Sequence, residues 1–163
     1  MKKLILSGLI LVAVSFNSTA QSISKNALGL RFGSNGDFGT EISYQRKLSK
    51  NNRLEADLGW RNNDNYDSFK ITGLYQWLWN IDNGFYWYAG AGAGIGNYSY
   101  NDNYHNDNYN DGGFATLGGD IGIEYNFDFP LQIALDFRPE MYFGNNLGDN
   151  FHSDLGLALR YKF

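Results

Sequence analysis

The chain has 163 residues, which is enough for one domain, and its formal net charge at neutral pH is −4. It contains no cysteine, and this excludes a disulfide framework and any thiolate-bound metal. Aromatic residues make up 17% of the chain, glycine contributes 20 residues and proline only 2, which favours β-structure. The negative mean hydropathy excludes a helical membrane protein.

Residues 1–20 have the features of a secretory signal peptide. Two lysines follow the first methionine, and the apolar run 4–14 has 11 residues, too few to span a bilayer, which favours a cleaved signal over a membrane anchor. Ser18 and Ala20 are small residues before a cut that leaves glutamine, not the cysteine of a lipoprotein, at the new N-terminus. We predict one domain over 21–163, and loss of the two lysines changes its net charge to −6.

The rest of the chain alternates apolar and polar residues in short segments, separated by clusters of Asn, Asp, Ser and Gly. A period of two is the signature of a strand with two different faces. It is clearest where Leu54, Ala56, Leu58 and Trp60 alternate with charged residues and glycine. The predicted strands are 27–33, 38–48, 53–61, 69–79, 85–96, 114–127, 131–143 and 155–163.

The connections between the eight predicted strands alternate in length. Those after the second, fourth and sixth strands are tight turns, whereas the others are longer on average and more polar and include the loops 62–68 and 97–113. This asymmetry is typical of outer-membrane barrels. Pro139 lies late in the seventh strand, where we expect a bulge or the end of ladder pairing. We predict an all-β fold, an eight-stranded antiparallel up-and-down transmembrane β-barrel.

The last predicted strand ends on alternating apolar residues, the final two being Tyr161 and Phe163. It resembles the C-terminal strand of bacterial outer-membrane β-barrels, where the terminal aromatic and the one two residues earlier are read by the barrel-assembly machinery. With the Gly/Ala segment 87–96 and the turn and strand 129–140, the chain is similar to the small eight-stranded OmpX/OmpA-type barrels of the porin-like family of Gram-negative bacteria. The resemblance implies an assembly signal at Tyr161 and Phe163 and a location in the outer membrane.

The polar face of the predicted strands carries eight basic and eight acidic residues, as an enclosed network of ion pairs requires. Glycines of the fifth strand lie on this face too, where a narrow interior needs space. We therefore expect this face to line the lumen; a soluble barrel with an apolar interior is the alternative. The basic residues are Arg31, Lys47, Arg53, Arg61, Lys70, Arg138, Arg160 and Lys162, and the acidic residues are Glu41, Glu55, Asp57, Asp120, Glu124, Asp136, Glu140 and Asp154.

The apolar face places aromatic residues near both ends of the strands, which is what the two interfaces of a bilayer select. At the turn end we expect Tyr44, Trp77, Trp79, Phe85, Trp87, Tyr125, Phe127, Tyr161 and Phe163. At the loop end we expect Phe32, Trp60, Phe69, Phe114, Phe137 and Tyr142.

The predicted outer loops contain aspartates but neither Lys nor Arg. Because carboxylate and amide oxygens are the ligands that Ca²⁺ and Mg²⁺ prefer, Asp102, Asp107 and Asp111 are candidates for a loop that binds divalent cations weakly, either alone or as bridges to anionic lipopolysaccharide. A rim that is only solvated is the alternative. The other aspartates of this rim are Asp37, Asp64, Asp67 and Asp149.

No motif predicts catalysis, a cofactor or nucleic-acid binding. His152 and Ser153 are adjacent, but neighbours in a strand point to opposite faces and cannot share a proton. We expect a monomeric, non-enzymatic outer-membrane protein with a structural or surface-interaction role, in contact with outer-membrane lipids and lipopolysaccharide. A small-solute or ion pore is the alternative, and a lipid-modifying outer-membrane enzyme is a more distant one.

Overall fold

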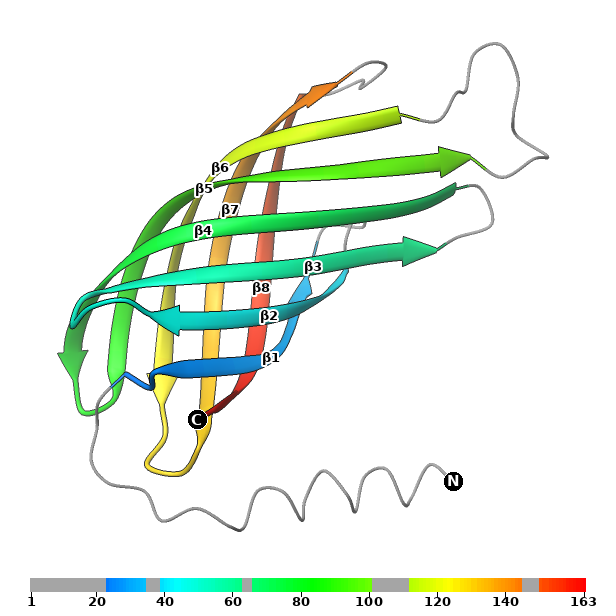
Figure 1. Cartoon of the computed structure of the whole chain (residues 1–163). Coiled ribbons are helices and arrows are strands. Elements are labelled where there is room, and N and C mark those ends of the chain that lie inside the picture. The colour runs from blue at the N-terminus through cyan, green and yellow to red at the C-terminus, as the bar shows by residue number, and fades with distance from the viewer. Residues whose placement is uncertain (1–22, 35–38, 63–65, 101–111, 145–149) are drawn as a thin grey trace, which may run out of the picture.

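A computed structural model of the chain describes residues 23–34, 39–62, 66–100, 112–144 and 150–163. These residues form one closed ring of eight strands, each antiparallel to its neighbours and adjacent in chain order (Figure 1). The strands are β1 (Asn26–Gly33), β2 (Thr40–Lys47), β3 (Asn52–Asn62), β4 (Tyr66–Asp82), β5 (Phe85–Tyr100), β6 (Gly112–Asn126), β7 (Leu131–Gly144) and β8 (Phe151–Lys162). The predicted eight-stranded antiparallel barrel is therefore confirmed.

The barrel closes where β1 pairs with β8. Leu28 lies opposite Tyr161 in this ladder, and Leu30 lies opposite Leu159. Beyond the ladder, the backbone N–H of Asn26 donates to the carbonyl oxygen of Phe163 at 3.0 Å, and the N–H of Phe163 donates back at 2.9 Å. Full closure leaves no unpaired edge along this seam, which a single layer of strands needs in order to avoid pairing with other chains.

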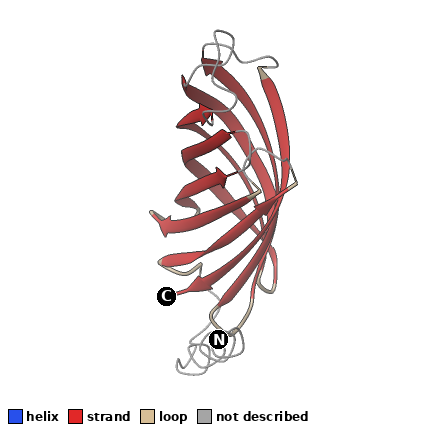
Figure 2. Cartoon of the chain, turned by 90° about the vertical axis from the view of Figure 1, so that its right-hand side faces the viewer, coloured by secondary structure: helices blue, strands red, loops and turns tan. Residues whose placement is uncertain are grey.

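The described part of the chain consists of strands and loops (Figure 2). No helix in it is both long enough and apolar enough to cross a membrane. The predicted signal peptide, 1–20, lies outside the described residues.

The tightest connection joins β4 to β5 through two residues, Asn83 and Gly84. Both have positive φ angles, 29° and 91°. Two positive φ values in a two-residue loop are typical of a type I′ turn, whose twist matches that of the strands it joins, and Asn-Gly is the preferred pair. Before the turn, β4 continues to Asp82, past the predicted end at residue 79. Its pairing with β5 has an irregularity between Asn80 and Asp82.

The strands extend further at the loop end than the sequence pattern predicted. The predicted loops 62–68 and 97–113 were too long, because β4 begins at Tyr66 and β5 continues to Tyr100. Likewise, β8 begins at Phe151 rather than at residue 155. The backbone ladders extend through polar residues here, where apolar alternation fades and leaves no signal in the sequence.

Pro139 does not end β7 or form a bulge. Its partner in β8 is Ser153, and that ladder is continuous. On the other side, the paired positions with β6 are interrupted between Gly118–Glu140 and Ile121–Phe137, with the register unchanged. Proline has no backbone N–H to donate, so the ladder with β6 is interrupted at this point and then resumes, and the expected bulge or end of pairing is not observed.

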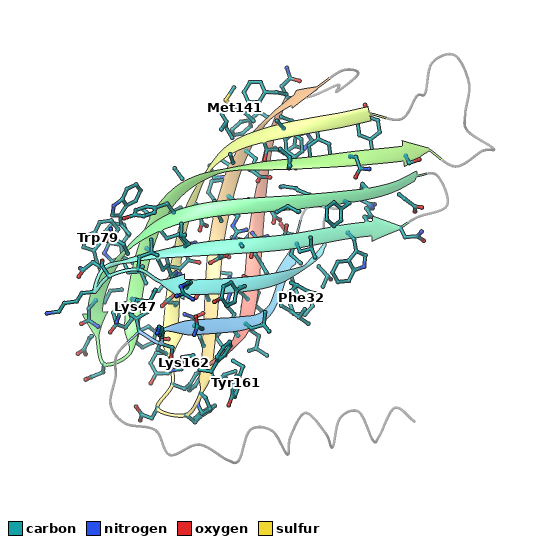
Figure 3. The ribbon with its side chains drawn as sticks, viewed as in Figure 1. Phe32, Lys47, Trp79, Met141, Tyr161 and Lys162 are labelled. Carbon is teal, nitrogen blue, oxygen red and sulfur yellow. The ribbon has the colours of Figure 1, made fainter. Side chains whose placement is uncertain are left out.

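The barrel has its polar side chains inside and its apolar side chains outside. Among the buried side chains of the described residues, polar and charged ones outnumber apolar ones. Large apolar side chains are exposed along every strand, and Trp79 and Met141 project outward at opposite ends of the wall (Figure 3). This arrangement is the reverse of a soluble protein, in which the apolar face is buried.

Two aromatic residues expected on the outer face point into the lumen. Phe114 and Tyr142 are each only 8% exposed, and their rings lie 5.4 Å apart. Phe114 lies an even number of residues from the inward-facing Asp120, as Tyr142 does from Arg138, so strand alternation requires both to face inward. Their assignment to the outer aromatic ring was therefore wrong, and Met141 and Phe143 are the exposed residues there.

We predict that Gly84→Ala destabilises the barrel by about 1–2 kcal/mol, because a side chain at positive φ clashes with its own backbone. A Cβ atom at this position would also lie 2.7 Å from the carbonyl oxygen of Asn126. Urea unfolding of the refolded barrel in detergent micelles measures the change.

The matched control is Gly73→Ala. A Cβ atom there has no neighbour within 4 Å, and no positive φ is involved. We expect this variant to be as stable as the parent or up to about 1 kcal/mol more stable. Equal losses for both variants would contradict the assignment of the turn.

Candidate functional site

The candidate site is the charged interior of the barrel. Alternation along each strand sends every second side chain into the lumen, so charged residues far apart in sequence converge there. Arg61, Glu140 and Asp154 are half-buried towards the loop end. The charged residues that are buried are Arg31, Glu41, Arg53, Glu55, Asp57, Lys70, Asp120, Glu124, Asp136, Arg138 and Arg160.

Arg138 crosses the lumen from wall to wall. It stands on β7, and in a ring of eight strands β7 and β3 face each other. Its Nη1 atom lies 2.5 Å from Oδ2 of Asp57, and its Nη2 atom donates to Oε1 of Glu55, both on β3. Its Nε atom lies 3.4 Å from Oδ1 of Asp120. One guanidinium group therefore ties opposite walls together.

Glu55 accepts hydrogen bonds from four side chains of the lumen. Besides Arg138, it accepts from Nη2 of Arg160 at 2.9 Å. Gln45 and Gln76 donate to its other oxygen at 2.6 Å and 3.1 Å. A buried carboxylate is tolerated only when its lone pairs are satisfied in this way, because its loss of hydration is otherwise uncompensated.

Arg31 organises a second group of carboxylates nearer the loop end. Its guanidinium forms three hydrogen bonds with Asp136, and its Nη1 atom lies 3.1 Å from Glu41 and 2.7 Å from Asp154. Gly156 lies beside the guanidinium, and a Cβ atom there would collide with it. The absence of a side chain at Gly156 therefore makes room for this arginine.

Arg53 and Tyr88 fill the lumen towards the turn end. Nη1 of Arg53 lies 2.5 Å from Glu124, and its guanidinium carbon lies 4.7 Å from the centre of the Tyr88 ring. A Cβ atom at Gly122 would clash with that ring, so glycine is required beside it. The interior at this level is filled by side chains.

Gln76 links Arg53 to the carboxylates that Arg138 contacts, and it was not identified in the sequence analysis. Its Oε1 atom accepts from Nε of Arg53, while its Nε2 atom donates to Glu55 and Asp120. Gln45 was missed for the same reason, namely that only charged residues were selected on the polar face. Both share the strand alternation of the charged residues, and that signal was available in the sequence.

The remaining basic residues lie towards the two ends of the barrel. Nζ of Lys70 lies 2.5 Å from Glu140 and 5.4 Å from the centre of the Tyr142 ring, near the loop end. Lys47 and Lys162, labelled in Figure 3, donate to the carbonyl oxygens of Ile23 and Phe127 at 3.2 Å and 2.7 Å. These lysines lie outside the central network.

The connected central network contains more acids than bases. Among the described residues, contacts join four arginines to seven carboxylates. The equal count in the sequence covers the whole polar face, which also includes basic residues outside this network. The arginines are Arg31, Arg53, Arg138 and Arg160, and the carboxylates are Glu41, Glu55, Asp57, Asp120, Glu124, Asp136 and Asp154.

The candidate cation-binding residues Asp102, Asp107 and Asp111 lie outside the described residues, as do Asp37, Asp64 and Asp149. Asp67 belongs to β4 and accepts a hydrogen bond from Asn62. Within the described ranges, no group of three or more His, Asp or Glu side chains is placed to hold a metal ion.

The adjacent pair His152 and Ser153 belongs to β8, so the two side chains leave the strand on opposite faces. The His152 ring packs 4.8 Å from that of Tyr142. The imidazole of His152 therefore cannot take a proton from the hydroxyl of Ser153.

These features define a class of protein: a closed antiparallel barrel of eight strands, with a filled polar lumen and an apolar outer surface. No protein-family model and no curated protein matches the chain. Solved structures do match, and they include the N-terminal β-barrel domain of Pseudomonas aeruginosa OprF, with a TM-score of 0.68 and 13% identity over 88% of this chain and 100% of that one.

Two further matches have similar coverage. Neisserial surface protein A has a TM-score of 0.60 and 15% identity over 85% of this chain and 94% of that one. Ail, the attachment invasion locus protein of Yersinia pestis, has a TM-score of 0.55 and 13% identity over 88% and 100%. All three proteins are small eight-stranded outer-membrane β-barrels. At such low identities the likeness is one of fold, and it confirms the resemblance seen in the sequence.

We predict that Arg138→Met destabilises the barrel by about 3–5 kcal/mol, because it removes the ion-pair partner of Asp57 and leaves that carboxylate uncompensated in the lumen. Methionine keeps much of the side-chain volume, so the loss reports charge rather than a cavity. Urea unfolding in detergent micelles measures it.

Arg46→Met is the matched control. Arg46 is exposed on β2, and its replacement should change the free energy of unfolding by less than about 0.5 kcal/mol. If the two substitutions have equal effects, the pairs that cross the lumen do not stabilise the barrel.

Proposed function

We propose that the chain is a bacterial outer-membrane protein with a structural or surface-interaction role, which is neither an enzyme nor an open pore. The observation that carries the proposal is the distribution of side chains, with charges enclosed and a continuous apolar surface outside. A barrel of this kind is stable in a bilayer, because closure satisfies the backbone hydrogen bonds of every strand and the apolar outer face is in contact with lipid. Export by the predicted signal peptide brings the chain to that membrane.

Aromatic residues at the turn end support this placement. Trp79 and Trp87 stack on the outer wall with ring centres 4.2 Å apart, and Phe85 packs 4.5 Å from Tyr125. Near the other end of β3, Trp60 is exposed. Amphipathic rings at both ends of an apolar wall suit the two membrane–water interfaces. Outer-membrane lipids and lipopolysaccharide are the partners we propose for this surface, around a monomeric barrel.

The crowded lumen favours a structural barrel over a pore. Side chains from β3 and β7 meet across its middle, and pairs between Arg53 and Glu124 and between Lys70 and Glu140 span it on either side. An eight-stranded barrel has just enough interior for side chains to fill. A lipid-modifying enzyme has less support, because His152 and Ser153 lack the geometry of a nucleophile and its base.

The purified barrel should insert into lipid vesicles and migrate differently on a gel before and after boiling. In planar bilayers it should give no large, steady single-channel currents, because the lumen is blocked by paired charges. Stable steps of uniform size from the pure protein would favour the pore. Absence of insertion, with a soluble monomeric barrel that needs no detergent, would contradict the membrane location.

We propose that Tyr161 and Phe163 form a signal for the barrel-assembly machinery. Phe163 is 58% exposed, although its backbone closes the barrel seam. We predict that Phe163→Ala lowers the amount of protein in the outer membrane of cells, while refolding in detergent is retained because the backbone bonds persist. Immunoblots of membrane fractions and gel mobility of the refolded protein measure the two effects.

The control for that experiment is Phe129→Ala. Phe129 is 54% exposed in the turn between β6 and β7, so the same apolar area is lost at the same end of the barrel. Membrane levels of this control should stay normal. Equal levels for the two variants would refute a specific signal at Phe163.

A further inference from the structure

Several buried oxygen atoms of the described residues lack hydrogen-bond partners, and three of them belong to residues on neighbouring strands: Oδ1 of Asp57, Oγ1 of Thr72 and Oγ1 of Thr116. Their residues are only 2%, 3% and 1% exposed. A buried polar atom without a partner costs free energy, so such a group in a well-connected interior requires a specific explanation.

The three residues lie in one row across adjacent strands. Asp57 on β3 is paired with Thr72 on β4, Thr72 with Gly94 on β5, and Gly94 with Thr116 on β6. A Cβ atom at Gly94 would lie 2.6 Å from Oγ1 of Thr116 and 3.1 Å from Oγ1 of Thr72. Both hydroxyl groups therefore lean over the one position in the row that has no side chain, and they converge there.

The charge around this row is negative. The central network has three more carboxylates than arginines, and Asp57 belongs to it through a single bond from Arg138 to its other oxygen. Lys70, two residues from Thr72 on the same strand face, is engaged by Glu140. Oδ1 of Asp57 thus has no partner of its own, within a network whose carboxylates outnumber its arginines.

We propose that the row forms a binding site for a small monovalent cation of the Na⁺ type, held by one carboxylate oxygen of Asp57 and the hydroxyl oxygens of Thr72 and Thr116. Oxygen atoms are the ligands that hard cations prefer. One carboxylate and two neutral hydroxyls carry a single formal negative charge, which matches a monovalent ion. The site goes beyond the proposed role in the membrane and does not depend on it.

The test compares barrels refolded from urea in NaCl with barrels refolded in N-methyl-D-glucamine chloride of the same ionic strength. Refolding loads an enclosed site, and the large organic cation cannot enter it. A ligand that binds only the folded state raises the midpoint of thermal unfolding with its concentration. We expect the midpoint to rise with the logarithm of Na⁺ concentration at constant total salt, as measured by gel mobility in detergent.

The double variant Thr72→Val/Thr116→Val should lose this dependence on Na⁺, whereas Thr40→Val, a half-buried position of β2, should retain it. Gly94→Ala fills the space between the hydroxyls and should abolish it too, while Gly73→Ala should not. Thr72→Ser keeps the hydroxyl and provides a folded reference if the valine variants fail to refold.

Identical midpoints for the parent barrel in the two salts at every concentration would overturn the proposal, and would indicate that protons neutralise the excess carboxylates. Persistence of the Na⁺ effect in the double-valine or Gly94→Ala variant would also overturn it, because the ion would then bind elsewhere. A Na⁺ effect that disappears in both, and remains in Thr40→Val and Gly73→Ala, supports the site.

Discussion

The contact of Arg138 with Glu55 and Asp57 joins two opposite walls of the barrel, β7 and β3. Strand ladders hold each wall only to its neighbours, and they leave the cross-section free to flatten. An arginine fork that bonds across the lumen opposes this flattening, because its planar donors must meet two carboxylates at once. Much of the remaining interior is arranged around that contact, with amides and further arginines satisfying the acids that Arg138 leaves partly bonded.

A lumen filled by long charged side chains needs space, and glycine provides it. Gly156 accommodates the guanidinium of Arg31, and Gly122 accommodates the ring of Tyr88. The strands therefore carry glycine at the positions that face the largest side chains of the lumen. A substitution at one of these glycines would act on the charged network as well as on the strand that contains it.

Alternation in the sequence was sufficient to predict eight strands and the face that most of their residues occupy, because a period of two leaves only one choice once one residue is placed. It failed where that rule was set aside. Phe114 and Tyr142 were assigned by residue type instead of by position, and the structure places them inside. The polar ends of β4 and β5 were predicted to be loops, because the strands pair there through residues that show no apolar alternation in the sequence.

The partners within the lumen were beyond the reach of the sequence. Which carboxylate meets Arg138 depends on the tilt and stagger of the strands around the whole ring, and one-dimensional spacing contains neither quantity. The neutral amides Gln45 and Gln76 occupy inward positions that the pattern identified, yet their bridging role emerges only when their neighbours are known. The composition of the interior was thus predictable, whereas its connectivity was not.

The seam between β1 and β8 has a consequence for how the barrel forms. All other ladders join strands that follow each other along the chain, but this one joins the first strand to the last. Its pairs pay a larger entropy of loop closure than any hairpin does, and they gain little until the intervening strands are in place. We therefore expect closure to be the late, cooperative step of folding, with the two outermost strands open to pairing with a neighbouring chain until it occurs.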